Sequence, residues 1–231
     1  MPGRLLSLLA NGPRLIVSLP DNSPELAQAA AHGGADALKV HIHVHHDASG
    51  TQFGDLAAER DNLVQILSLG LPTGIVPGAS GRTASRQEID ELAAMGMDFF
   101  DLYARDMPPW MMTFDGMTRA VAIDARTSLE TVGEFERMGF HMVEAAIVPH
   151  DQYGAPLSVA DLVAYRQVRR ATKLPIIVPT QRAIRPGEAP ILVRDAGIDA
   201  VMIGAIVTGR EPASLRAATQ EFAAALSGVS R

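Results

Sequence analysis

The segment from residue 38 to residue 45 alternates apolar side chains with side chains that can exchange protons. Its even positions are Leu, Val, Ile and Val, and its odd positions are Lys39, His41, His43 and His45. Because successive side chains of a β-strand point to opposite faces, the pattern predicts one apolar face and one face with an ammonium and three imidazoles. Three histidines on one strand span about 13 Å and cannot all bind one ion, although two neighbours could do so with a carboxylate. We assign no metal; ordinary core or loop histidines remain an alternative to a wall that contacts a polar substrate.

The same alternation predicts further polar side chains on the inner faces of three later strands. These are Asp101, Tyr103 and Arg105 on one strand, Asp124 at the end of the next, and Glu144 with His150 on the third. A buried charge is costly unless it is paired or used in chemistry. A structural ion-pair network could explain two such buried charges more easily than all five, which are Lys39, Asp101, Arg105, Asp124 and Glu144. We therefore expect this set to form a catalytic or substrate-binding site.

These residues lie in a chain that alternates short β-branched runs with longer helical patterns. Strands are predicted near 14–20, 35–45, 73–78, 98–105, 118–124, 142–149, 174–180 and 200–206. Helices are predicted near 23–33, 55–69, 84–95, 127–138, 159–172, 187–196 and 212–226. This alternation predicts an α/β protein with one domain over residues 1–231, a closed (β/α)8 barrel whose site lies in the strand-to-helix loops. An open doubly wound sheet is the alternative, but the turn after the first strand lacks the glycines typical of that fold.

Composition and charge exclude several classes of function. The 231 residues include no cysteine, which excludes disulfides, thiolate metal sites and cysteine nucleophiles. The formal net charge of −6, without a basic run, disfavours nucleic acid as a partner. No apolar run approaches the roughly 18 residues of a membrane-spanning helix. We expect a cytoplasmic protein without a cofactor or a membrane partner, which acts as a homodimer or a higher homo-oligomer.

The last two predicted strands end in segments that are typical of phosphate binding. Gln181 and Arg182 follow the seventh strand, and Gly204 and Ala205 follow the eighth. Barrels that hold phosphorylated ligands often use these two loops, where glycine allows close approach to backbone N–H groups. A phosphate would then contact these four residues. The competing interpretation is that Gly204 serves strand packing and that Arg182 is a solvated loop residue.

Short motifs along the chain resemble the N-acetylmannosamine-6-phosphate 2-epimerase family of ribulose-phosphate-binding barrels. They are Ile16-Val17-Ser18, Leu71-Pro-Thr-Gly-Ile-Val76, Ala122-Ile123-Asp124, Val201-Met-Ile-Gly-Ala-Ile206 and the Arg182 turn. The resemblance implies the barrel fold and a phosphate end at Arg182, Gly204 and Ala205. Two positions depart from that family, because Pro77 stands where it has a catalytic lysine and Thr180 precedes Gln181 where it has an acidic residue. Lys39 occupies a position at which the family carries arginine.

Three functions are compatible with these residues. The first is an isomerase or epimerase of a small phosphorylated sugar, with Glu144 as the base, Asp124 as a further acid–base group, and Lys39 with His41 stabilising an oxyanion. The second is a lyase or aldolase in which Lys39 forms a Schiff base after Arg105 lowers its pKa. The third is a ligand-binding barrel without catalysis. The Met- and Trp-rich segment 105–117 is expected to be a lid or a subunit contact, with local packing as the alternative.

Overall fold

Eight parallel strands close into a barrel in the computed structural model, which describes residues 3–79 and 81–230. Around the barrel they follow the order β1 (Arg14–Ser18), β2 (Ala37–His41), β5 (Thr73–Val76), β8 (Phe99–Tyr103), β9 (Thr118–Ile123), β10 (Met142–Ala145), β11 (Ile176–Pro179) and β12 (Ala200–Ile203). Parallel pairing of β12 with β1 closes the ring. The predicted (β/α)8 barrel is therefore confirmed, and each predicted strand contains one of these eight.

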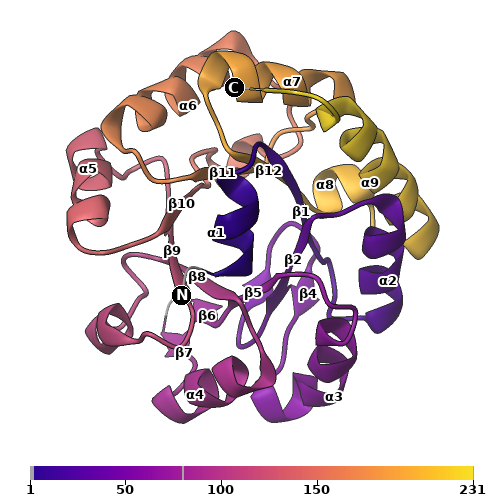
Figure 1. Ribbon diagram of the computed structural model, residues 1–231, viewed down its shortest axis with the longest axis vertical. Helices are drawn as coiled ribbons and strands as arrows, with labels where there is room; N and C mark the ends of the chain where they lie inside the picture. Colours follow the sequence, from indigo (N-terminus) through magenta and orange to yellow (C-terminus); the bar gives the residue numbers. More distant parts are fainter. Residues whose placement is uncertain (1–2, 80, 231) are drawn as a thin grey trace.

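The helices surround the barrel and cover its outer face (Figure 1). They are α2 (Pro24–Gly33), α3 (Leu56–Leu67), α4 (Arg86–Met95), α5 (Leu129–Arg137), α6 (Val159–Ala171), a segment made of η3 (Pro186–Glu188), α7 (Ala189–Ile191) and η4 (Leu192–Ala196), and finally α9 (Pro212–Leu226). Four of them begin at a serine whose side chain accepts the N–H three residues later, which satisfies one of the free donors of the first turn. No helix of the described chain is long and apolar enough to cross a membrane.

A short helix that the sequence patterns did not predict, α1 (Arg4–Leu9), lies at the centre of the ring in Figure 1. Its Leu5 and Leu9 are buried among barrel residues such as Phe99. The Asp98 carboxylate accepts the N–H groups of Arg4 and Leu5 at 2.7 and 2.8 Å and so caps the first turn. Because these apolar side chains fill the N-terminal end of the barrel, a ligand must enter from the opposite end.

The loops at the C-terminal ends of the strands form small elements of their own. They contain a hairpin of β3 (His45–His46) and β4 (Thr51–Gln52), a hairpin of β6 (Gly78–Ala79) and β7 (Arg82–Thr83), the helical turns η1 (Pro109–Thr113) and η2 (His150–Gln152), and α8 (Ala205–Thr208). These loops are the ones that the sequence predicted to build the functional end.

The segment 105–117 packs locally over the rim of the barrel. Met111 is fully buried and Phe114 is 5% exposed. The guanidinium of Arg86 on α4 lies 5.3 Å from the ring centre of Trp110 and 5.4 Å from that of Phe114. This arrangement supports local packing, the alternative to a lid or a subunit contact, because Arg86 contacts both rings and Phe114 is buried within the chain.

Candidate functional site

A cavity of about 530 Å³ opens at the C-terminal end of the barrel. Its lining includes most of the predicted site residues, namely Lys39, His41, His43, Asp101, Tyr103, Arg105, Glu144, His150, Gln181, Gly204 and Ala205. Asp124 and Arg182 are not among the lining residues. The alternation on β2, β8 and β10 therefore located the cavity. The predictions for Asp124, at a strand end, and Arg182, in a loop, were wrong in placing these side chains at the cavity.

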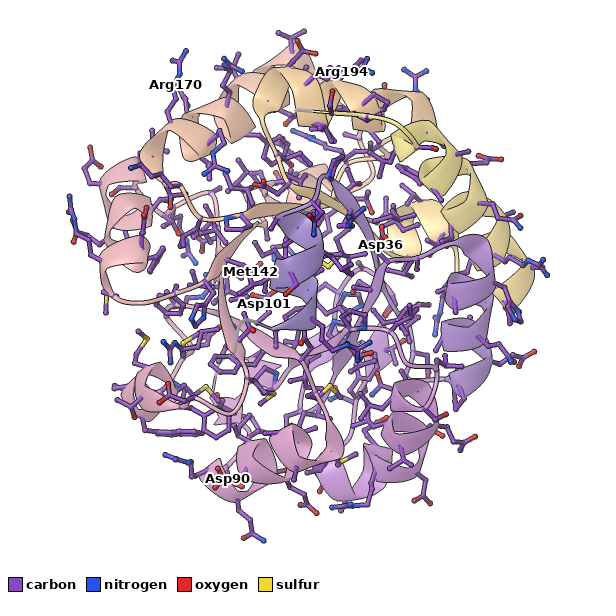
Figure 2. All side chains as sticks on the ribbon, viewed as in Figure 1. Asp36, Asp90, Asp101, Met142, Arg170 and Arg194 are labelled. Carbon is purple, nitrogen blue, oxygen red and sulfur yellow. The ribbon has the colours of Figure 1, made fainter. Side chains whose placement is uncertain are left out.

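The floor of the cavity is an ion cluster that joins three strands. The Lys39 ammonium on β2 donates to Asp101 Oδ2 on β8 at 3.1 Å and also to Glu144 Oε2 on β10. The three side chains are at most 9% exposed, and Asp101 lies near the centre of the ring of strands in Figure 2. Asp101 Oδ1 is buried without a hydrogen-bond partner in the described chain. The cluster therefore holds two carboxylates and one ammonium, and its charges are only partly compensated.

The cluster changes the proton affinities of its members. Burial raises the pKa of Glu144 well above its usual value, and the charge of Asp101 raises it further against the opposing effect of Lys39. For Lys39, burial acts to lower the pKa, but the charges and hydrogen bonds of Glu144 and Asp101 outweigh it and raise the pKa above its usual value. Lys39 is therefore a cation that two carboxylates hold in place, and Glu144 is a carboxyl whose proton is retained more strongly than usual.

The histidines after β2 do not continue the alternation. The strand ends at His41, and His43 has a φ of 58°, in the left-handed region that side chains other than glycine rarely adopt. His43 Nε2 contacts Glu88 Oε1 on α4 at 2.8 Å, and His45 is exposed at the cavity rim. This local reversal brings His46 inward in place of His45, and its ring centre lies 4.6 Å from that of His41.

The hairpin and a buried asparagine hold His41 in place, and the sequence analysis identified neither. Phe53 follows β4, and its ring centre lies 4.9 Å from that of His41. Asn22 is fully buried, donates to the His41 carbonyl at 2.6 Å and accepts the His41 N–H at 3.2 Å. Asn22 also donates to Glu59 Oε2 at 2.9 Å. The only signal in the sequence was a polar residue in the turn after β1, which turn propensity alone explains.

Arg105 and Asp124 form a rim pair instead of joining the ion cluster. The Asp124 carboxylate accepts hydrogen bonds from the side chains of Arg105, Arg126 and Thr127 and from the Arg126 N–H. Burial acts to raise the pKa of Asp124, but these bonds and the Arg105 charge lower it. The Arg105 guanidinium also lies 4.2 Å from the ring centre of Tyr103. The expected roles of Asp124 as an acid–base group and of Arg105 as a neighbour of Lys39 are therefore not supported, because β9 ends at Ile123 and the following turn folds back on Asp124.

The side of the cavity near β10 and β11 is lined by polar groups that bond to one another. Gln181 accepts the Val148 N–H at 3.1 Å and donates to the Tyr153 hydroxyl. His150 lies beyond the end of β10, stacks on Tyr153 with 4.8 Å between ring centres, and has Nδ1 3.3 Å from Asp47 Oδ2. With its side chain 67% exposed, His150 is a residue of the cavity mouth and not an inward residue of a strand.

At the expected phosphate end, the structure separates Arg182 from Gly204 and Ala205. The Arg182 guanidinium bonds Asp161 Oδ1 at 2.9 and 3.1 Å and the Gln152 side chain at 2.8 Å. It ties the η2 loop to α6 and is neither a cavity residue nor a solvated one, since its side chain is 12% exposed. The Gly204 N–H donates to Thr180 Oγ1 at 3.0 Å. The N–H groups of Ala205 and Ile206, both at the cavity, have no partner within the described residues.

No group of three or more His, Asp or Glu side chains is placed to hold a metal ion in the described part of the chain. The lining combines a carboxyl with a raised pKa, a fixed ammonium, several imidazoles and several hydroxyls. Such a set can move a proton and stabilise negative charge on an oxygen atom.

No model of a protein family matches this sequence, and no curated protein matches it significantly. Similar solved structures include a chain of tryptophan synthase from Mycobacterium tuberculosis, with 16% identity, a TM-score of 0.75, and 98% of this chain and 99% of that chain covered. A protein from Aquifex aeolicus matches with 12% identity, a TM-score of 0.69 and coverage of 98% and 99%. The N-acetylmannosamine-6-phosphate 2-epimerase from Clostridium perfringens matches with 19% identity, a TM-score of 0.62 and coverage of 88% and 90%. At such identities the likeness concerns the fold, and on that ground the chain is a (β/α)8 barrel.

Proposed function

We propose that this protein is an enzyme that transfers a proton at a carbon next to a carbonyl group in a small phosphorylated sugar. The observation that carries the proposal is the Lys39–Asp101–Glu144 cluster at the cavity floor. A carboxyl group with a raised pKa is suited to act as a base near neutral pH. An adjacent ammonium can stabilise the enediolate that forms when the proton leaves. Isomerases and epimerases of sugars both need this pair of groups.

The phosphorylated character of the substrate rests on two supports. Ala205 and Ile206 line the cavity beside Gly204, and their N–H groups donate to no group of the described residues. Among the structures of similar fold is that of an epimerase whose name specifies a phosphorylated sugar. The motifs shared with that family favour a divergent relative, in which Glu144 and Lys39 on other strands take the places of the family's own acid–base groups. Arg182 has no part in this proposal because its guanidinium is bonded elsewhere.

The geometry favours this role of Lys39 over a Schiff base. A lysine nucleophile needs a lowered pKa, so that a neutral amine is present to attack a carbonyl. Two carboxylates contact Lys39 and raise its pKa, whereas Arg105, the residue expected to lower it, pairs with Asp124. Lys39 therefore supports the proposal as a fixed positive charge.

The proposal is tested by hydrogen exchange. Sugar phosphates of three to six carbons are incubated with the protein in D2O, and loss of the proton next to the carbonyl is followed by NMR. We expect exchange with at least one compound, and Glu144→Gln should slow it about 100- to 10,000-fold. The exposed Glu130→Gln is the matched control and should exchange like the parent protein. Exchange at the parent rate in Glu144→Gln, or exchange with no compound of the panel, would refute the proposal.

A further inference from the structure

The three groups of the ion cluster meet at one point of the cavity. Asp101 and Glu144 both contact the same atom, Lys39 Nζ, so the cluster is a single unit on the cavity floor. Epimerisation with simple acid–base groups removes a proton from one face of a carbon and returns it to the other, which requires groups on opposite faces. Isomerisation of an aldose to a ketose instead moves a proton between neighbouring carbons on one face. A single base such as Glu144 is sufficient for the second reaction.

Isomerisation also requires a proton to move between the two neighbouring oxygen atoms, and His41 is placed to move it. Its side chain lies on the same inner face of β2 as Lys39, two residues further along, which is about 6.6 Å for extended chain. The residue is 2% exposed, and its Nδ1 is buried with no partner in the described chain. Since His41 lines the cavity, Nε2 is the ring nitrogen that a ligand can reach.

The surroundings of His41 favour a neutral imidazole. The ring packs against Phe53 and His46, and the charged group nearest along its strand face is the Lys39 ammonium. No carboxylate of the described residues forms an ion pair or a hydrogen bond with the ring. In support, burial lowers the pKa of His41 well below its usual value, and His46 and Lys39 lower it further. A neutral imidazole with a proton on Nε2 can donate it and take one back.

We infer that His41 is a catalytic residue that relays a proton between adjacent substrate oxygens, and that the reaction interconverts an aldose phosphate and a ketose phosphate. This inference rests on the proposed function. Glu144 takes the proton from the carbon that carries the hydroxyl group, and the electron pair moves through the new C=C bond to the carbonyl oxygen. His41 Nε2–H gives its proton to that oxygen, and the neighbouring hydroxyl returns a proton to Nε2 as its oxygen becomes the new carbonyl. Glu144 then delivers its proton to the former carbonyl carbon, so atoms and electrons balance without an oxidant.

Asn22 and Phe53 are positioning residues in this scheme. The Asn22 amide bonds both the N–H and the C=O of His41, which fixes the backbone from which the ring projects. Phe53 covers one side of the ring, with an angle of 31° between the ring planes. Their contribution is to keep Nε2 within reach of both substrate oxygens, and loosening the ring should lower kcat more than it changes KM.

The first experiment examines the protein without substrate. Nitrogen NMR of the histidine side chains should show that His41 remains neutral, with its proton on Nε2, from about pH 5 to pH 8. Assignment uses His41→Gln, which removes the signals of this ring alone. A charged ring at neutral pH, or a proton on Nδ1 alone, overturns the inference.

The second experiment separates the two proton transfers. In D2O, His41→Gln should lose aldose–ketose conversion about 100-fold or more while exchange of the substrate carbon-bound proton continues. Because His41→Gln could fail to fold, Phe53→Leu provides a second test that keeps the imidazole and alters only its packing. Phe53→Leu should lower kcat with KM nearly unchanged. Conversion by His41→Gln at the parent rate, or an epimer as the only product of the parent protein, overturns the inference and leaves the proposed function standing. Absence of exchange from every compound overturns both.

Discussion

Replacing Lys39 by methionine tests whether the ion cluster is the energetic centre of the site. Methionine has a similar length but no charge, so the substitution leaves Asp101 and Glu144 buried without the ammonium. No other cation of the described chain forms an ion pair or a hydrogen bond with either carboxylate. Breaking a buried ion pair by removing one partner costs about 3–5 kcal/mol. We expect the free energy of unfolding at about pH 7 to fall by that amount.

The loss should depend on pH in a defined direction. Without Lys39, which opposes the rise, the pKa of Glu144 in the folded protein lies still further above that in the unfolded chain. Between the pKa in the unfolded chain and the higher pKa in the folded protein, the folded state binds more protons than the unfolded state. The free energy of unfolding therefore falls as pH increases through this interval. The deficit of Lys39→Met should therefore be smaller at about pH 5 than at about pH 7. Adding Glu144→Gln to the variant removes one buried charge and should recover part of the lost stability.

Urea unfolding followed by the fluorescence of Trp110, the only tryptophan, measures these changes. Lys173→Met is the matched control, because it replaces the only other lysine, which is exposed. We expect a change of less than about 0.5 kcal/mol for the control. A deficit below about 1 kcal/mol for Lys39→Met at neutral pH, or a deficit that does not narrow in acid, would refute this account of the cluster.

Three further predictions follow from other features of the barrel. Gly74→Ala should destabilise the protein by about 1–3 kcal/mol, because a Cβ there would lie 2.1 Å from the Phe99 ring, whereas Gly187→Ala, with no atom within 4 Å, should be neutral in the same urea assay. Burial lowers the pKa of His46 from 6.5 to about 4, so His46 should remain neutral in NMR titrations until about pH 4. The protein should lose stability as pH falls from 6.5 to about 4, because the unfolded chain binds this proton more readily than the folded protein. A normal imidazole titration would show that the hairpin does not bury it. Gly204→Val should fold, since its Cβ meets no atom closer than 3.8 Å, yet calorimetry should show loss of binding to sugar phosphates; equal affinity of the parent protein for phosphorylated and unphosphorylated forms would contradict a phosphate site.

The strand alternation was sufficient to predict the barrel and the inner residues of three strands. Lys39, Asp101 and Glu144 each lie within a regular strand, where the direction of a side chain follows from its parity. The helices predicted near 23–33 and 84–95 end at those residues in the structure, where Gly34 and Gly96 adopt positive φ just after the C-termini of α2 and α4. These features depend on local geometry, which neighbouring residues in the sequence determine.

Only the tertiary structure decided which groups meet beyond the ends of the strands. After the left-handed residue His43, His46 and not His45 packs against His41, and parity along the sequence cannot anticipate such a reversal. Arg182 is bonded to Asp161 on α6 and lies outside the cavity lining, because a flexible charged side chain pairs with the nearest opposite charge that folding brings to it. Loop conformations result from contacts between residues far apart in the chain. The sequence pattern therefore located the site residues on the strands, whereas the tertiary structure decided which side chains the loop residues contact.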